Sequence, residues 1–296
     1  MTILIFSQDG TYAKARLIQE FAKHNTDLLF SSTHKDFVLY ASQNTYRKCF
    51  FKNELIDLPS AIIIRLPPNL TDYYFCSLIR QFESMGVPVI NNIKSIELAR
   101  DKFHTHQILS KHDISTPKTM IVKHGGHYNI VNNEIGFPCV LKTYPGSFGR
   151  GVKLCRTFNE FKDMCMFVDE VTTSHNLIAQ QFISANPGKI IRSIVIGDII
   201  SFPMKRIGPR DGDIRTGIDA GNDGTTEKYP ITEEIRKLSY DIVKIMNLDI
   251  AGIDFLFDNN KFTVSEVNVC PNFETYEKLY NTNLIQHIVN LVLSKI

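Results

Sequence analysis

The chain has 296 residues, enough for two or three compact domains, and 33 Lys and Arg against 31 Asp and Glu leave a net charge of +2. Such a balance argues against a protein that binds nucleic acid or an anionic membrane through its overall charge. Hydrophobic residues make up 43% and charged residues 22%, which excludes a disordered chain, and no apolar run approaches the ~20 residues of a membrane span. Six scattered cysteines and the lack of a signal-peptide pattern predict a cytoplasmic protein with free thiols.

The first part of the chain alternates between apolar strands and helical spacing. Strands are expected at Ile3–Phe6, Ala61–Ile64 and Val87–Ile90, with helices at Ala13–Phe21 and Leu78–Met85. Continuous apolar strands that alternate with helices are typical of a parallel sheet covered on both faces. We therefore expect a small open α/β domain over residues 1–95.

Two further units are expected, over residues 96–180 and 181–296. In the first, the pattern predicts a helix at Lys94–His112, strands at Thr119–Val122, Cys139–Leu141 and Val152–Cys155, a helix at Asn159–Val168, and an apolar segment at Leu177–Ile183. In the second, it predicts a strand–turn–strand at Ile190–Ile200, a long loop at Gly208–Gly224, a helix at Thr232–Met246, a hairpin of Ile250–Phe257 and Phe262–Val269, and a helix at Thr282–Leu293.

A glycine-rich turn at Gly146, Gly149 and Gly151 lies between two predicted strands. Its spacing matches neither the dinucleotide fingerprint nor the P-loop, so the usual phosphate motifs are absent. Backbone N–H groups of such a turn can still hold phosphate oxygens, and Lys142 at the end of the preceding strand would add a charge. The alternative is a plain surface hairpin with a solvated lysine.

The C-terminal hairpin carries three oxygen-bearing side chains, Asp254, Glu266 and Asn268, in an apolar context. Glu266 and Asn268 are two residues apart and share a strand face. A two-residue turn would place Asp254 opposite Ser265 and turn Glu266 to the other face, whereas a three-residue turn or a bulge would place Asp254 opposite Glu266. Hard oxygen ligands favour Mg²⁺ or Mn²⁺ over Zn²⁺. The alternative is a solvated polar face.

The other reactive side chains form weaker patterns. His104 and His106 lie two apart on a predicted helix and point to different sides, so a structural or surface role is expected. Cys270 is better explained as a small buried residue than as a nucleophile. Five cations flank or enter the long loop and would suit a triphosphate: Arg192, Lys205, Arg206, Arg210 and Arg215.

In chain order, these features resemble the ATP-grasp fold, and most closely its ribosomal protein S6–glutamate ligase (RimK)-like carboxylate–amine ligases. The resemblance covers residues 87–296 and rests on eight segments: Ala99–Lys102, Val140–Lys142, Gly146–Val152, Gln180–Ile183, Lys205–Arg206, Asp213–Arg215, Ala251–Asp254 and Glu266–Pro271. It implies a pre-ATP-grasp α/β domain followed by a two-lobed ATP-grasp fold.

The resemblance also implies roles for individual residues. ATP would be held by Lys102, Lys142, the lid residues Ser147, Gly149 and Gly151, and the hinge residues Gln181, Phe182 and Ile183. Two Mg²⁺ ions, with Mn²⁺ as the alternative, would be bound by Asp254, Glu266 and Asn268. Arg215 would contact the γ-phosphate, and Arg192 and Lys205 complete the expected catalytic set.

The chemistry that the resemblance implies is activation of a carboxylate as an acyl phosphate, followed by attack of an amine to form an amide. The expected substrates are an amino acid or other carboxylate and an amine on a peptide, a protein tail or a small metabolite, with a homo-oligomer left open. Two rival functions remain: a nucleotide-binding regulator without turnover, and an ATP-grasp phosphotransferase.

Three departures from the family pattern limit what carries over. Ile190 stands where close relatives have an aspartate near the ribose, and Gly217 stands where they have an asparagine. Asp219 and Ala220 replace positions that are basic in the enzymes that modify the ribosomal protein. The pattern therefore does not predict an acidic amino acid as the substrate.

Overall fold

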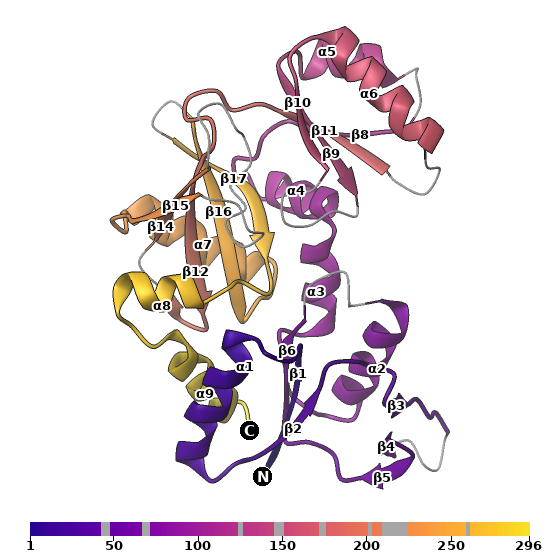
Figure 1. Ribbon diagram of the computed structural model, residues 1–296, viewed down its shortest axis with the longest axis vertical. Helices are drawn as coiled ribbons and strands as arrows, with labels where there is room; N and C mark the ends of the chain where they lie inside the picture. The colour runs from indigo at the N-terminus through magenta and orange to yellow at the C-terminus, as the bar shows by residue number, and fades with distance from the viewer. Residues whose placement is uncertain are drawn as a thin grey trace.

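The computed structural model describes residues 1–42, 48–66, 72–123, 127–144, 151–171, 176–200, 203–208, 224–258 and 261–296. The described strands form four sheets. The N-terminal open sheet lies at the bottom of the view in Figure 1, the C-terminal sheet lies above it, and the smaller lobe with β8–β11 lies at the top. Among the described helices, none combines the length and apolar character needed to cross a bilayer.

The N-terminal sheet is parallel, with strand order β2-β1-β6-β7. Its elements are β1 (Thr2–Ser7), α1 (Tyr12–Phe21), the 3₁₀ turn η1 (Ala22–His24), β2 (Asp27–Ser31), β6 (Ala61–Arg65), α2 (Tyr73–Ser84) and β7 (Val89–Ile90). A separate antiparallel sheet consists of β3 (Phe37–Val38), β4 (Cys49–Phe51) and β5 (Glu54–Ile56). The expected open α/β sheet is thus present, with α1 packed against one face and α2 against the other.

The single helix expected at Lys94–His112 is wrong, because two helices occupy this segment: α3 (Ile93–Arg100) and α4 (Lys102–Lys111). Asp101 between them has extended backbone angles, φ −83° and ψ 100°. Its side chain accepts a hydrogen bond from the backbone N–H of His104 at 3.0 Å and so caps α4. The break makes Lys102 the first residue of a helix.

The second sheet is antiparallel, with order β10-β9-β11-β8. It contains β8 (Thr119–Val122), α5 (Tyr128–Glu134), β9 (Cys139–Tyr144), β10 (Val152–Cys155), α6 (Phe158–Val171) and β11 (Asn176–Gln181). Helices α5 and α6 cover one face through a cluster of its own that includes Val131, Phe161 and Leu141. The sequence pattern did not predict α5, which has only two turns.

The third sheet has six antiparallel strands in the order β15-β14-β12-β16-β17, with β13 also paired to β12. Its elements are β12 (Lys189–Ile196), β13 (Ile199–Ile200), β14 (Met204–Ile207), β15 (Thr225–Lys228), α7 (Glu233–Ile245), β16 (Ile250–Asp258), β17 (Lys261–Asn268), α8 (Glu274–Tyr280) and α9 (Leu284–Ser294). Helix α7 packs on one face, and α8 and α9 pack on the other. Thr232 caps α7 as expected, whereas α8 was not predicted.

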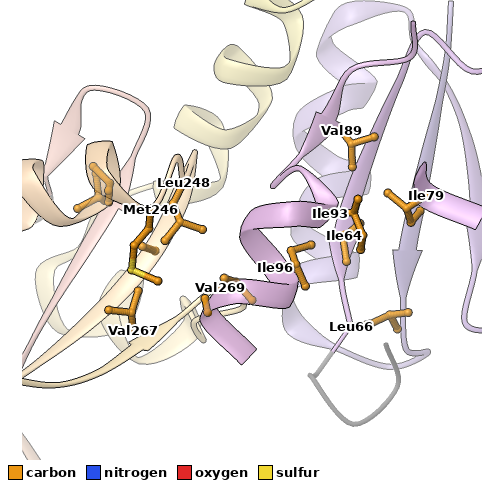
Figure 2. Close-up of a cluster of buried hydrophobic side chains, with 14 of the residues drawn as sticks. Ile64, Leu66, Ile79, Val89, Ile93, Ile96, Met246, Leu248, Val267 and Val269 are labelled. Atoms are coloured by element: carbon orange, nitrogen blue, oxygen red, sulfur yellow. The ribbon is translucent and has the colours of Figure 1, made fainter. Parts of the chain in front are cut away.

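One apolar core connects the N-terminal sheet to the third sheet (Figure 2). Helix α3 contributes Ile93 and Ile96, which lie between Val89 of the N-terminal sheet and Val267 and Val269 of β17 and the segment after it. Beside this core, the buried amide of Asn91 donates to Ile250 O at 2.8 Å and accepts from the N–H groups of Asp249 and Ile250 at 2.6 and 2.7 Å. The two sheets are therefore joined by packing and by a satisfied polar contact.

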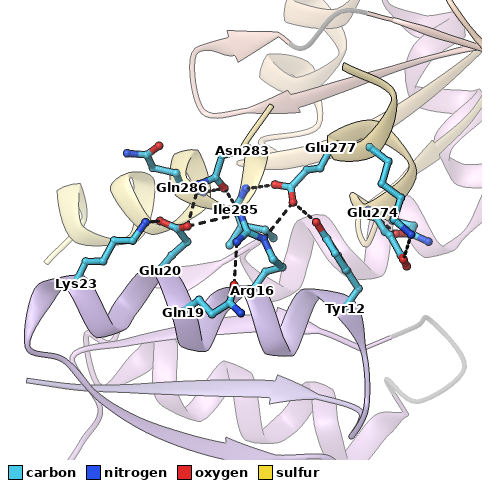
Figure 3. Close-up of polar contacts among 12 residues, drawn as sticks. Tyr12, Arg16, Gln19, Glu20, Lys23, Glu274, Glu277, Asn283, Ile285 and Gln286 are labelled. Carbon is cyan, nitrogen blue, oxygen red and sulfur yellow. Dashed lines mark hydrogen bonds and ion pairs between the residues drawn. The ribbon is translucent and has the colours of Figure 1, made fainter. Parts of the chain in front are cut away.

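A polar network adds a second connection between the same two parts (Figure 3). The buried carboxylate of Glu277 on α8 accepts hydrogen bonds from the Tyr12 hydroxyl and from the Arg16 guanidinium, at 3.3 Å for the latter, both on α1. It also accepts from the backbone N–H of Ile285 at the start of α9, at 3.1 Å. Glu277 thus fixes α1, α8 and α9 to one another.

Asn91→Ala should weaken the connection between the first and third sheets. The change leaves two backbone N–H groups and one carbonyl buried without partners, so we expect the free energy of unfolding to fall by about 2–4 kcal/mol. Asn290→Ala, on the exposed face of α9, is the matched control and should leave stability within ~0.5 kcal/mol. Urea unfolding followed by circular dichroism measures both; equal stabilities of the two variants would contradict the assignment.

Candidate active site

Three charged side chains form a row across the third sheet. Arg192 on β12 pairs directly with Asp254 on β16, which pairs directly with Glu266 on β17. Residues directly opposite one another in an antiparallel sheet project to the same face. Arg192, Asp254 and Glu266 therefore share one face of the sheet.

A β-bulge produces this alignment. Asp258 pairs with Lys261, so two residues separate the strands, and a regular ladder would place Ser265 opposite Asp254. The register shifts between Asp254 and Phe255, and Ser265 is the extra residue that the shift absorbs. Of the two geometries that bring the carboxylates together, the bulge is the one observed.

The Asp254 carboxylate is held by Arg192 in a bidentate ion pair. The Arg192 Nε and Nη2 atoms donate to Oδ1 and Oδ2 at 2.5 and 2.6 Å, and the two residues are only 7% and 4% exposed. Burial alone would lower the pKa of Arg192, but the adjacent Asp254 charge and its hydrogen bonds raise it. Asp254 is thereby fixed in one orientation.

Glu266 faces the smaller lobe and is paired with Lys102 at the start of α4. Its side chain is 43% exposed, which makes it the accessible carboxylate of the row. Burial between the lobes favours the neutral form, but the nearby ammonium groups of Lys102 and Lys142 and the hydrogen bond from Lys102 lower the pKa of Glu266 to about 2. It is therefore an anion at neutral pH.

Lys142 reaches the same region from β9 of the second sheet. Burial and the like charge of Lys102 lower its pKa to about 8, and the carboxylates of Glu266 and Asp254 offset part of this effect. These interactions show that side chains from both lobes converge. The Lys142 ammonium donates to the Gln180 side-chain oxygen at 2.7 Å.

Gln180 is a site residue that the sequence reasoning missed. Its amide nitrogen donates to His106 Nε2 on α4 and to Thr119 Oγ1 on β8, both at 3.0 Å. Burial, together with the charges of Lys142 and Lys102, lowers the pKa of His106 to about 4, so this imidazole is neutral and Nε2 accepts. His106 and Gln180 therefore position Lys142, and a glutamine inside an apolar strand was the available signal.

Asn268 lies two residues beyond Glu266 and pairs with Gly252. Its side-chain oxygen accepts a hydrogen bond from the Cys270 N–H at 2.9 Å and keeps a second lone pair. In the described part of the chain, no three His, Cys, Asp or Glu side chains lie close enough to hold a metal. The predicted set instead combines two carboxylates with an amide, and these hard oxygen donors fit Mg²⁺.

The hinge residues lie between the second and third sheets. Gln181 ends β11, where its N–H donates to Lys118 O at 2.8 Å, and Phe182 and Ile183 follow on the way to β12. Ile183 is buried and Phe182 is half-buried. The segment is thus placed between the second and third sheets.

Lys205 is not brought into this group. It pairs with Ile191 on β12, so it projects from the opposite face of the sheet to Arg192, and its ammonium contacts Glu227 at 3.1 Å. Gly151, the last glycine of the glycine-rich turn, has φ +72°, and a Cβ there would lie 2.1 Å from Thr143 Oγ1, so glycine is required at this position. Three predicted residues, Ser147, Gly149 and Arg215, lie outside the described residues.

Comparison with known proteins agrees with this arrangement. Residues 99–292 match the RimK-like ATP-grasp domain, and residues 1–96 match the RimK PreATP-grasp domain. The chain belongs to the RimK-like ATP-grasp family. The predicted family and fold class are confirmed, and with them the prediction of an ATP-dependent ligase that forms a carbon–nitrogen bond.

Two relatives are named probable alpha-L-glutamate ligases. The protein of Maridesulfovibrio salexigens is 32% identical over 244 residues, 82% of this chain and 79% of that one. The protein of Shewanella sp. strain MR-4 is 35% identical over 233 residues, 78% and 75% of the two chains.

Solved structures share the fold of this RimK-like chain. The RimK domain protein ATP-grasp from Sphaerobacter thermophilus superposes with a TM-score of 0.76 at 18% identity over 99% of this chain and all of that one. The ATP-grasp ligase PsnB, complexed with a minimal precursor, Mg and ADP, gives 0.73 at 13% identity over 99% and 97%.

Lys142→Met should change how stability depends on pH. The pKa of Lys142 is about 8 in the folded chain and near its ordinary value of 10.5 in the unfolded chain. Between these two pH values the unfolded chain therefore binds more protons than the folded chain. The free energy of unfolding of the parent therefore gains a contribution as pH rises from about 8 to about 10.5, which the variant lacks. We expect the variant to be the more stable protein at pH 7, on the order of 1 kcal/mol, and to lose this advantage by pH 10.

Urea unfolding of the nucleotide-free proteins at the two pH values measures the effect. Lys153→Met, which replaces an exposed lysine on β10, controls for the general loss of a positive charge. An advantage of Lys142→Met that is the same at pH 7 and pH 10 would refute the lowered pKa of Lys142.

Proposed function

We propose that this enzyme forms an amide by way of an acyl phosphate. A carboxylate oxygen of the acid substrate attacks the γ-phosphorus of ATP, and the bond from that phosphorus to the β–γ bridging oxygen breaks to release ADP. The nitrogen of the amine then attacks the acyl carbon, the C–O bond to phosphate breaks, and the amine loses a proton. Family membership and the converging charges of the site support this sequence.

The observation that carries the proposal is the group of cations from both lobes around two carboxylates. A carboxylate and a triphosphate repel each other, so their reaction needs positive charge at the point of contact. Lys102 and Lys142 supply it from α4 and β9, and each is already oriented, one by Glu266 and the other by Gln180. Arg192 acts as a positioning residue, because its guanidinium is committed to Asp254.

Asp254, Glu266 and Asn268 would hold Mg²⁺, as two ions, with Mn²⁺ as the alternative. When bound, the metal supplies positive charge that offsets the phosphate oxygens. The chain's own part is to keep Glu266 ionised, which Lys102 and Lys142 do, and to keep Asp254 oriented, which Arg192 does.

The remaining assignments follow the family pattern. The backbone of Gln181, Phe182 and Ile183 would hold adenine at the hinge. The turn that contains Ser147, Gly149 and Gly151 would close over the triphosphate and exclude water, which protects an acyl phosphate from hydrolysis. Arg215 would contact the γ-phosphate or the acyl phosphate. Lys205 has no part in this site because it projects from the other face of the sheet.

An amino acid joined to a peptide, a protein tail or a small amino metabolite is the proposed substrate pair. The names of the relatives favour glutamate, whereas Asp219 and Ala220 replace basic residues and disfavour an acidic side chain. We assign the reaction to the cytoplasm, with domains at residues 1–95, 96–180 and 181–296 and without nucleic-acid or membrane partners.

Glu266→Gln should abolish turnover and leave the fold intact. The substitution removes the charge of the accessible carboxylate but keeps its size, so we expect ADP release in saturating Mg²⁺ and amino-acid substrates to fall at least ~100-fold. Glu227→Gln is the matched control, a glutamate paired with a lysine on the opposite face of the same sheet. Coupled measurement of ADP release, with circular dichroism for the fold, tests both; a variant that retains parent activity would disprove the role.

Hydroxylamine separates the proposed ligase from its rivals. With ATP, Mg²⁺ and each of the twenty common L-amino acids, an acyl phosphate is trapped as a hydroxamate. A stable phosphorylated product would instead indicate a phosphotransferase, and nucleotide binding without ADP release would indicate a regulator.

A further inference from the structure

Arg65 is a buried guanidinium that the proposed catalytic set does not use. It ends β6 of the N-terminal sheet, is 7% exposed, and lies with its guanidinium 4.5 Å from the centre of the Phe273 ring. Its Nη2 donates to the carbonyl oxygen of Pro271 at 2.5 Å. Its Nε and Nη1 atoms are buried and have no hydrogen-bond partner.

A buried cation with free donors is costly unless an anion completes it. Among the residues that the structure describes, no carboxylate lies within ion-pair distance of Arg65, whereas Arg192 has a bidentate partner in Asp254. The ring of Phe273 and the single carbonyl offset only part of the cost. Arg65 could therefore accept an anion that the described residues do not supply.

The position of Arg65 is one where open parallel sheets bind ligands. From β1 the chain passes through α1 to β2 on one side, whereas β6 lies on the other side of β1 and continues into α2 on the opposite face. The carboxyl ends of β1 and β6 thus meet at a topological switch point, where such sheets bind ligands. Ser7 and Arg65 are the paired residues at these two ends.

Arg65 is also connected to the face of the third sheet that carries the carboxylates. Its acceptor Pro271 packs over Gly252, where a Cβ would lie 2.9 Å from the proline ring and 3.8 Å from the Arg192 side chain. Gly252 pairs with Asn268 and lies two residues before Asp254. An anion on Arg65 is thereby placed beside the proposed site.

We propose that Arg65 binds a carboxylate of the amino-acid substrate. A guanidinium recognises the planar carboxylate through paired hydrogen bonds, which an ammonium group does not reproduce. The carboxylate has two sources, the α-carboxylate of the amino acid that supplies the amine and the carboxylate that is activated. The identity of the ligand rests on the proposed ligase function, whereas the requirement for an anion rests on Arg65 alone.

The first test observes Arg65 directly and needs no turnover. In protein labelled with ¹⁵N at arginine Nε, the Arg65 resonance is the one lost in Arg65→Lys or Arg65→Gln. With Mg²⁺ and ADP present, the twenty common L-amino acids and their α-amides are added one at a time. A shift with at least one amino acid and none with its amide supports the proposal; no shift with any amino acid overturns it.

The second test is kinetic and compares Arg65→Lys with Arg80→Lys, a control at an exposed arginine paired with Glu97. Loss of a charge-assisted hydrogen bond should raise the KM of the stimulating amino acid about 10- to 100-fold in Arg65→Lys. The KM for ATP should stay at the parent value, as should both constants in the control. Equal changes in the two KM values, or no change, would overturn the proposal.

Two further comparisons distinguish the two sources of the carboxylate, and distinguish the carboxylate site from the proposed ligase function. If the amino acid that shifts the Arg65 resonance also forms a hydroxamate, the carboxylate bound by Arg65 is the one that ATP activates. If that amino acid forms no hydroxamate, the bound carboxylate belongs to the amino acid that donates the amine. If Arg65 shifts but the parent releases no ADP with any amino acid, the ligase proposal fails and the carboxylate site stands.

Discussion

Ser265 is the residue on which the geometry of the site depends. A two-residue turn and a regular ladder would place Glu266 and Asp254 on opposite faces of the sheet. The extra residue in β17 moves every later side chain of the strand to the opposite face of the sheet, so Glu266 lies on the same face as Asp254. Val264, before the bulge, still packs into the core with Phe255. Both demands, an apolar face for α7 and a polar face for the site, are met by one inserted residue.

The site is electrostatically incomplete by itself. Asp254 and Arg192 balance each other, but Glu266 alone faces both Lys102 and Lys142, and burial together with the like charge of Lys102 lowers the pKa of Lys142. An excess of positive charge between two lobes suits a triphosphate. In the nucleotide-free protein this excess is destabilising, because the cationic groups are held close together before the ligand binds.

Periodicity predicted most of the fold but not the features that depend on tertiary context. Strands β1, β6 and β7 of the N-terminal sheet and the final hairpin carry apolar runs and lie where expected, whereas β2 of the same sheet was not predicted. Helices α5 and α8 have only two turns, which is too short for a clear amphipathic pattern. In the sequence Asp101 resembles an ordinary polar helix residue, and only its hydrogen bond to the His104 N–H identifies it as a helix cap.

The site was predictable in composition and not in register. The residue types of Asp254 and Glu266 were informative, yet only the structure distinguishes a bulge from a longer turn. Gln180 and Arg65 were missed for a related reason. A single polar residue in or at the end of an apolar strand has no local partner in the sequence, and its significance depends on contacts 74 and 206 residues away.

The distribution of the apolar cores determines which parts can move. Two clusters each contain residues from both the N-terminal sheet and the third sheet, and Asn91 and Glu277 add polar connections between them. The core of the second sheet, in contrast, contains residues of that lobe alone. A rotation of this lobe would therefore disturb mainly polar contacts such as that between His106 and Gln180. Lys142 would move with the lobe, whereas Arg65, Asp254 and Glu266 would keep their relative positions. A nucleotide could thus be enclosed without displacing the groups proposed to bind the metal and the substrate carboxylate.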